Sequence, residues 1–165
     1  MIAVDTNLLV YAHRADSDWH DRAEAAVRGL AEGAEPWAIP WPCLHEFIAI
    51  AIAIAIGIAT HPRIYQPPSP FEVAARQVEA WLASPSLVLL TETTAHWPAL
   101  RSVLGAGRVV GPKVHDARIA ALCIQHGVRE LWSADRDFGG HGGARHAQSA
   151  AWIPRVATVT PRALR

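Results

Sequence analysis

The sequence has few cysteines and no excess of charge of either sign. Its 165 residues include two cysteines, Cys43 and Cys123, which are too few to cross-link a chain of this length into a disulfide-bonded scaffold. Neither cysteine has the close metal-binding neighbours of a zinc site. Lysine and arginine together number 15, as do aspartate and glutamate, so no overall positive charge attracts a polyanion. Support for nucleic-acid chemistry must therefore come from local motifs.

Signals for secretion and membrane insertion are also missing. The first residues, Met-Ile-Ala-Val-Asp, lack the basic stretch and the long apolar region of a secretory signal. The candidate membrane segment, residues 47–59, has about 13 residues, whereas roughly 20 are needed to span a bilayer. We therefore expect a cytoplasmic protein that does not insert into a membrane.

The composition is that of a compact globular protein. Hydrophobic residues make up 51% of the chain and charged residues 18%, which argues against a largely disordered polypeptide. The length suits one domain with a sizeable core and is short for two. We predict a single domain spanning residues 1–165.

Short apolar runs alternate with amphipathic segments along the chain. An alternation of strands and helices predicts a parallel α/β sheet covered by helices. One helix start is marked by Ser69, Pro70 and Glu72, which together match a capping box. Strands are expected at residues 2–4, 87–90, 130–133 and 156–159, and helices after Asp5, from Asp18, from Ser69, near Thr94 and from Pro112.

An isoleucine–alanine repeat occupies residues 48–56. Its period of two favours a strand. Alanine is the best helix former, however, and the flanking residues fit the two ends of one long buried helix. We favour the helix and keep the strand as the alternative.

Four acidic residues are placed where they can converge. Asp5 and Asp135 follow predicted strands, and the carboxyl ends of parallel strands gather at one edge of a sheet. Glu46 and Asp116 lie on predicted helices that can flank the same crevice. Clustered carboxylates repel one another unless cations neutralise them, and hard oxygen ligands suit Mg²⁺ or Mn²⁺. Such ions can activate water for phosphodiester hydrolysis.

Each carboxylate also has an ordinary structural explanation. Asp5 can be a helix cap, Glu46 a solvated helix residue, Asp116 a partner of its helix dipole and Asp135 a turn residue. Taken singly, these residues do not establish a site.

In these same segments the chain resembles the PIN-domain ribonucleases, most closely the VapC-type toxins of bacterial toxin–antitoxin systems. The ordered set of matches spans nearly the whole chain, which makes it far more specific than any one motif. The matching pieces are VDTNLLVYA at residues 4–12, Glu46, HDARIAAL at residues 115–122 and SADRDF at residues 133–138.

The resemblance implies a three-layer α/β/α sandwich with a short central parallel sheet. It also implies an Mg²⁺- or Mn²⁺-dependent endoribonuclease that cuts structured RNA, forms a homodimer and is inhibited by a cognate antitoxin protein. Asp5, Glu46, Asp116 and Asp135 would be the catalytic and metal-binding residues, with Asp137, Ser133 and Asn7 in support.

Other interpretations remain open at the level of sequence. A catalytically silent binding module would keep the PIN-like fold without needing metal, and metal-dependent cleavage separates the two. A phosphatase on a similar sheet commonly has a second aspartate where this chain has Asn7, which counts against that function.

The nine histidines lack the paired spacing of zinc ligands. A group of basic residues either forms a phosphate-binding rim or is simply solvated: Arg63, Lys113, Arg118 and Arg136.

Overall fold

A computed structural model describes residues 1–52, 69–106, 109, 111 and 113–134, together with the backbone of residues 155–158. A five-stranded sheet with the order β3-β2-β1-β4-β5 lies at its centre, and all neighbouring strands are parallel. The strands are β1 (Ile2–Val4), β2 (Trp37–Pro40), β3 (Leu87–Leu90), β4 (Glu130–Ser133) and β5 (Arg155–Thr158). The parallel sheet predicted from the alternating pattern is confirmed.

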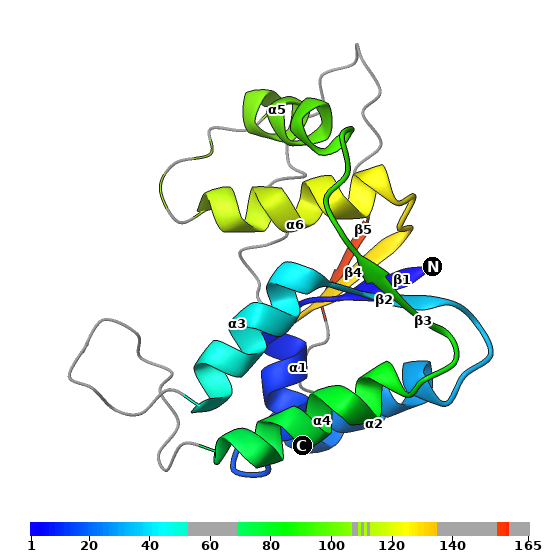
Figure 1. The fold of residues 1–165 in the computed structure, drawn as a ribbon, viewed down its shortest axis with the longest axis vertical. Helices are drawn as coiled ribbons and strands as arrows, with labels where there is room; N and C mark the ends of the chain where they lie inside the picture. Colours follow the sequence, from blue (N-terminus) through cyan, green and yellow to red (C-terminus); the bar gives the residue numbers. More distant parts are fainter. Residues whose placement is uncertain (53–68, 107–108, 110, 112, 135–154, 159–165) are drawn as a thin grey trace, which may run out of the picture.

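Helices cover both faces of the sheet. In Figure 1, α5 and α6 lie on one side of the strands, and α1 to α4 lie on the other. This arrangement confirms the three-layer α/β/α sandwich. The helices are α1 (Thr6–His13), α2 (His20–Ala31), α3 (Trp41–Ile52), α4 (Phe71–Leu82), α5 (His96–Ala106) and α6 (Lys113–Gln125).

Strand β2 was not predicted from the sequence. It is short, and Pro36 and Pro40 lie at its two ends, where proline normally indicates a loop. All four of its residues are nevertheless buried, because β2 lies between β1 and β3. The strand exists because its neighbours and the helices above and below it exclude water.

The Ala-Ile repeat is helical where the structure describes it. Helix α3 continues to Ile52, so the helix prediction is confirmed for residues 48–52, while residues 53–56 lie outside the described part. Ala51 is buried, and its carbonyl accepts a hydrogen bond of 2.8 Å from the backbone of Ser69. Among the described residues, none of the helices is both long and apolar enough to cross a membrane.

The predicted capping box at the start of α4 is wrong. Pro70 is the residue that precedes the helix, and no side chain caps it. The hydroxyl of Ser69 lies 2.9 Å from Nε2 of His13 at the end of α1 instead. The Ser69 hydroxyl, which the local pattern assigned to the backbone of α4, therefore contacts a side chain at the end of α1.

The strand register brings the predicted site together. Val4 pairs with Trp132, and the backbone N–H of Asp5 donates to the carbonyl of Trp132 at 3.0 Å. The carboxyl ends of β1 and β4 therefore lie side by side, with Asp5 after one strand and Ser133 at the end of the other.

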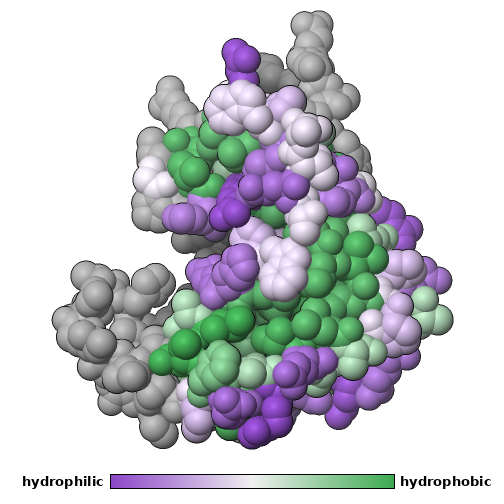
Figure 2. All heavy atoms as spheres, viewed as in Figure 1, coloured by the Kyte–Doolittle hydropathy of each residue, from purple (hydrophilic) through white to green (hydrophobic). Residues whose placement is uncertain are grey.

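Part of the apolar surface is left exposed at the edge of the sheet. Figure 2 shows a continuous hydrophobic area right of centre, over the region where Figure 1 shows β3 and the helices beneath it. Val88 on β3 is 39% exposed, and Leu82 at the end of α4 is 42% exposed. In the part of the chain that the structure describes, β3 is the edge strand of the sheet on this side.

Candidate active site

Asp5 lies at the junction of β1 and α1, where it caps the helix. Its Oδ1 accepts a hydrogen bond of 2.8 Å from the backbone N–H of Thr6. Its Oδ2 accepts a second bond, of 2.9 Å, from the hydroxyl of Ser133. The side chain of Asp5 is buried, so this carboxylate is fixed by two donors and is itself largely shielded from water. The structural role of a helix cap and a role in an active site are therefore compatible at this residue.

The surroundings of Asp5 raise its pKa from 3.8 to about 6. Burial is the largest cause, because it removes the charged form from water. The hydrogen bonds from Ser133 and Thr6 act in the opposite direction, and the negative charges of Glu46 and Asp116 raise the pKa further. The fold thus brings two further predicted carboxylates, those of Glu46 and Asp116, close enough to Asp5 to raise its pKa.

Glu46 reaches the site from α3. Its side chain is exposed, and its Oε2 accepts a hydrogen bond of 2.8 Å from the hydroxyl of Thr6. Thr6 was not among the predicted site residues, although it belongs to the matching segment at residues 4–12. Nothing in the local pattern indicates this role, because its partner lies 40 residues away in the sequence.

Asn7 and Ser133 join α1 to the end of β4. The Asn7 side chain donates to the Ser133 hydroxyl at 3.0 Å, and this hydroxyl donates in turn to Asp5. The Asn7 Oδ1 also accepts a hydrogen bond of 2.9 Å from the backbone of Ala134. These contacts fit the supporting roles expected of Asn7 and Ser133. Asp135 and Asp137, which follow directly, lie outside the described residues.

Asp116 lies in the first turn of α6 and is partly exposed. Helix α6 packs against α5, and it also contacts β2. Helices α6 and α3 lie on opposite sides of the sheet (Figure 1), and the charge of Asp116 contributes to the raised pKa of Asp5.

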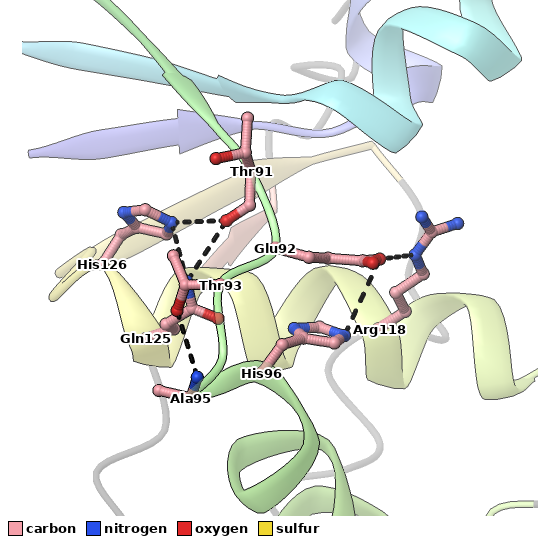
Figure 3. A network of polar contacts seen from close by, with 8 residues as sticks. All are labelled: Thr91, Glu92, Thr93, Ala95, His96, Arg118, Gln125 and His126. Atoms are coloured by element: carbon pink, nitrogen blue, oxygen red, sulfur yellow. Dashed lines mark hydrogen bonds and ion pairs between the residues drawn. The ribbon is translucent and has the colours of Figure 1, made fainter.

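The predicted phosphate-binding rim is only partly described, and one of its members is engaged elsewhere. The Nε of Arg118 donates to Glu92 at 2.6 Å, and Nε2 of His96 lies 3.8 Å from the same carboxylate oxygen. Figure 3 shows this group beside the segment that leads from β3 to α5. Arg118 thus ties α6 to that segment, while Arg63 and Arg136 lie outside the described part of the chain.

The donor atoms at the site fit a hard divalent cation. Asp5, Glu46 and Asp116 supply carboxylate oxygens, the ligands that Mg²⁺ and Mn²⁺ prefer. Each carboxylate has about four lone-pair positions, so the hydrogen bonds to Asp5 leave it able to bind a cation. Among the described side chains, no group of three histidine, cysteine, aspartate or glutamate residues is arranged to hold a metal ion. Asp135, the fourth predicted ligand, lies outside the described residues.

Known protein sequences similar to this chain belong to the PIN-domain and VapC ribonuclease groups. Residues 2–142 match the family model for the PIN domain. Ribonuclease VapC37 of Mycobacterium tuberculosis is 34% identical over 153 residues, an alignment that covers 93% of this chain and 100% of the relative. VapC ribonuclease Mb2897 of Mycobacterium bovis is 33% identical over 138 residues, which covers 84% of this chain and 88% of the relative.

Solved structures share the fold at low sequence identity. VapBC2 from Rickettsia felis, bound to a DNA fragment from its promoter, has a chain that superposes with a TM-score of 0.61 at 15% identity, covering 96% of this chain and 98% of that one. VapC20 of M. tuberculosis, a toxin that cleaves the sarcin-ricin loop, gives a TM-score of 0.60 at 15% identity and covers 93% of this chain and 100% of its own.

Proposed function

The chain belongs to the PIN-domain family, and on this premise we propose that it is a metal-dependent endoribonuclease of the VapC type, the toxin of a toxin–antitoxin pair. The observation that carries the proposal is the environment of Asp5. A buried aspartate whose pKa is raised to about 6, partly by two further carboxylates, is costly to keep charged. A bound divalent cation relieves that cost.

We assign the catalytic and metal-binding roles to Asp5, Glu46, Asp116 and Asp135. These residues would hold a divalent cation, which would supply an activated water and charge stabilisation for phosphodiester hydrolysis. Asp5 is oriented by Ser133 and by the backbone of Thr6, so its carboxylate is held in one direction before a cation binds. We place Ser133, Asn7 and Asp137 in support of these ligands.

The proposed partners follow from the relatives. The solved toxin that cleaves the sarcin-ricin loop supports structured RNA as the substrate, and the VapBC2 complex supports a cognate antitoxin. We propose that a second copy of the chain packs on the hydrophobic area that Figure 2 shows over β3 and the helices beneath it, because exposed apolar surface of this kind often marks an interface. We propose one domain that acts in the cytoplasm.

Purified protein should cut structured RNA at a few positions in the presence of Mg²⁺ or Mn²⁺, and should leave it intact in EDTA. Mapping RNA ends by sequencing, both in vitro and after induction in cells, would test this expectation. Asp116→Asn is the matched control, because it removes one carboxylate charge from the site without changing the shape of the side chain. The same set of ends from parent and control would contradict the proposal, and RNA binding without any cleavage would indicate a binding module instead.

A further inference from the structure

Thr6 contacts two of the site carboxylates through different atoms. Its backbone N–H donates to Oδ1 of Asp5 at 2.8 Å, and its hydroxyl donates to Oε2 of Glu46 at 2.8 Å. These two acceptors come from separate elements, because Asp5 follows β1 and Glu46 lies on α3. Thr6 is the first residue of α1 and is buried. It therefore links the fixed carboxylate of the site to the exposed one.

We propose that Thr6 is a positioning residue whose hydroxyl holds Glu46 beside Asp5 and so sets the affinity of the site for a divalent cation. The inference rests on the proposed function, because it assumes that these carboxylates bind metal. Glu46 needs such a partner. Its side chain is long and exposed, and an unrestrained glutamate loses more conformational entropy when a cation binds.

The direction of the Thr6 hydroxyl is well defined. A β-branched side chain has few allowed rotamers in a helix, and Thr6 is held at the helix start by the hydrogen bond to Asp5. The neighbouring space is also filled. The Sγ of Cys43, one turn before Glu46 on α3, lies 3.9 Å from Oδ1 of Asp5. The start of α1 and the second turn of α3 thus meet at Thr6, and Glu46 is the acidic residue of α3 at this contact.

The competing explanation is that the hydroxyl merely ties α1 to α3. Outer hydrogen-bond partners of metal ligands typically change metal affinity by roughly 10- to 100-fold when they are lost. A purely structural tie would change the stability of the protein and leave metal affinity as it was. Metal affinity, measured on folded protein, therefore separates the two explanations.

Thr6→Val is the informative substitution, and Thr6→Ser is its matched control. Valine keeps the branched shape and removes the donor, and the exposed Glu46 oxygen can be hydrated instead, so we expect a folded protein. Mn²⁺ titration followed by electron paramagnetic resonance should show binding weakened by roughly 10-fold in Thr6→Val and close to the parent in Thr6→Ser. RNA cleavage by Thr6→Val should fall at limiting Mn²⁺ and approach the parent rate at saturating Mn²⁺.

A double-substitution cycle tests whether Thr6 acts through Glu46. In a Glu46→Gln background, Thr6→Val should weaken Mn²⁺ binding no further, since the carboxylate that it positions is already gone. Equal Mn²⁺ affinity in parent and Thr6→Val, or equal weakening in both backgrounds, would overturn the inference. If Thr6→Val does not fold, Thr6→Ala takes its place with the same expectations. A parent that binds no Mn²⁺ would overturn the proposed function and this inference together, whereas a parent that binds Mn²⁺ and cuts RNA isolates the role of Thr6.

Discussion

Asp5→Asn, Glu46→Gln and Asp116→Asn should each lower the rate of RNA cleavage by more than about 100-fold, a larger loss than outer partners of metal ligands usually cause. Each substitution removes one ligand charge and keeps the shape of the side chain, so the fold should persist. The rates should be measured at saturating Mn²⁺, with circular dichroism to verify that each variant is folded.

Glu24→Gln provides a matched control for these three variants. Glu24 is a partly exposed carboxylate that pairs with Arg28 one turn away on α2, a helix that carries none of the proposed site residues. Its neutralisation should leave cleavage unchanged. We expect Asp135→Asn to resemble Asp116→Asn, and Asp137→Asn to cause a smaller loss. Near-normal cleavage by all three carboxylate variants would refute the assigned site.

In the absence of metal, Asp5→Asn should be more stable than the parent at neutral pH. The pKa of Asp5 is about 6 in the folded protein, whereas an aspartate exposed to water has a pKa of 3.8. At about 1.4 kcal/mol for each pH unit of difference, the charged carboxylate lowers the free energy of unfolding by at most about 3 kcal/mol at pH 7. Asparagine carries no charge and avoids this cost.

The pH dependence gives the sign of the effect. Because the pKa of Asp5 is higher in the folded protein than in the unfolded chain, protonation of Asp5 favours the folded protein. This contribution to the free energy of unfolding of the parent is complete below pH 3.8 and is lost as the pH rises through about 6. The stability difference between Asp5→Asn and parent should therefore grow between pH 4.5 and pH 7. Urea unfolding in EDTA at these two pH values measures it.

Mn²⁺ serves as the control for this measurement. A cation that binds only the folded parent stabilises it by mass action. Excess Mn²⁺ should therefore reduce or reverse the difference in free energy of unfolding between Asp5→Asn and the parent at pH 7. If Asp5→Asn is less stable than the parent in EDTA and the parent does not respond to Mn²⁺, the carboxylates belong to a structural cluster rather than a metal site.

Local patterns were enough to predict most of the secondary structure. The expected strands at residues 2–4, 87–90 and 130–133 agree with β1, β3 and β4, and the alternation with helices indicated the parallel sheet. The errors occurred where long-range packing competes with local preference. β2 forms between two prolines because it is enclosed by its neighbours, and Ser69 leaves the predicted cap to contact His13.

In the candidate site, too, residue identities could be predicted from local sequence, whereas long-range contacts could not. Asp5, Glu46 and Asp116 were predicted as site residues, and the fold brings their charges together. The link between Thr6 and Glu46 was not predictable, because a hydroxyl next to an aspartate is compatible with many partners. The predictions for Asp135 and Asp137 concern residues outside the described part of the chain.

The sequence by itself determined the alternation of strands and helices, the family resemblance and the acidic residues that we propose for the site. These depend on hydrophobic periodicity and on the identity of residues close together in the chain. Only the tertiary structure decided how Asp5 is buried and which groups hold it. Its hydrogen bond with Ser133 joins residues 128 positions apart, and the raised pKa of Asp5 arises first from the exclusion of water by strands and helices packed around it.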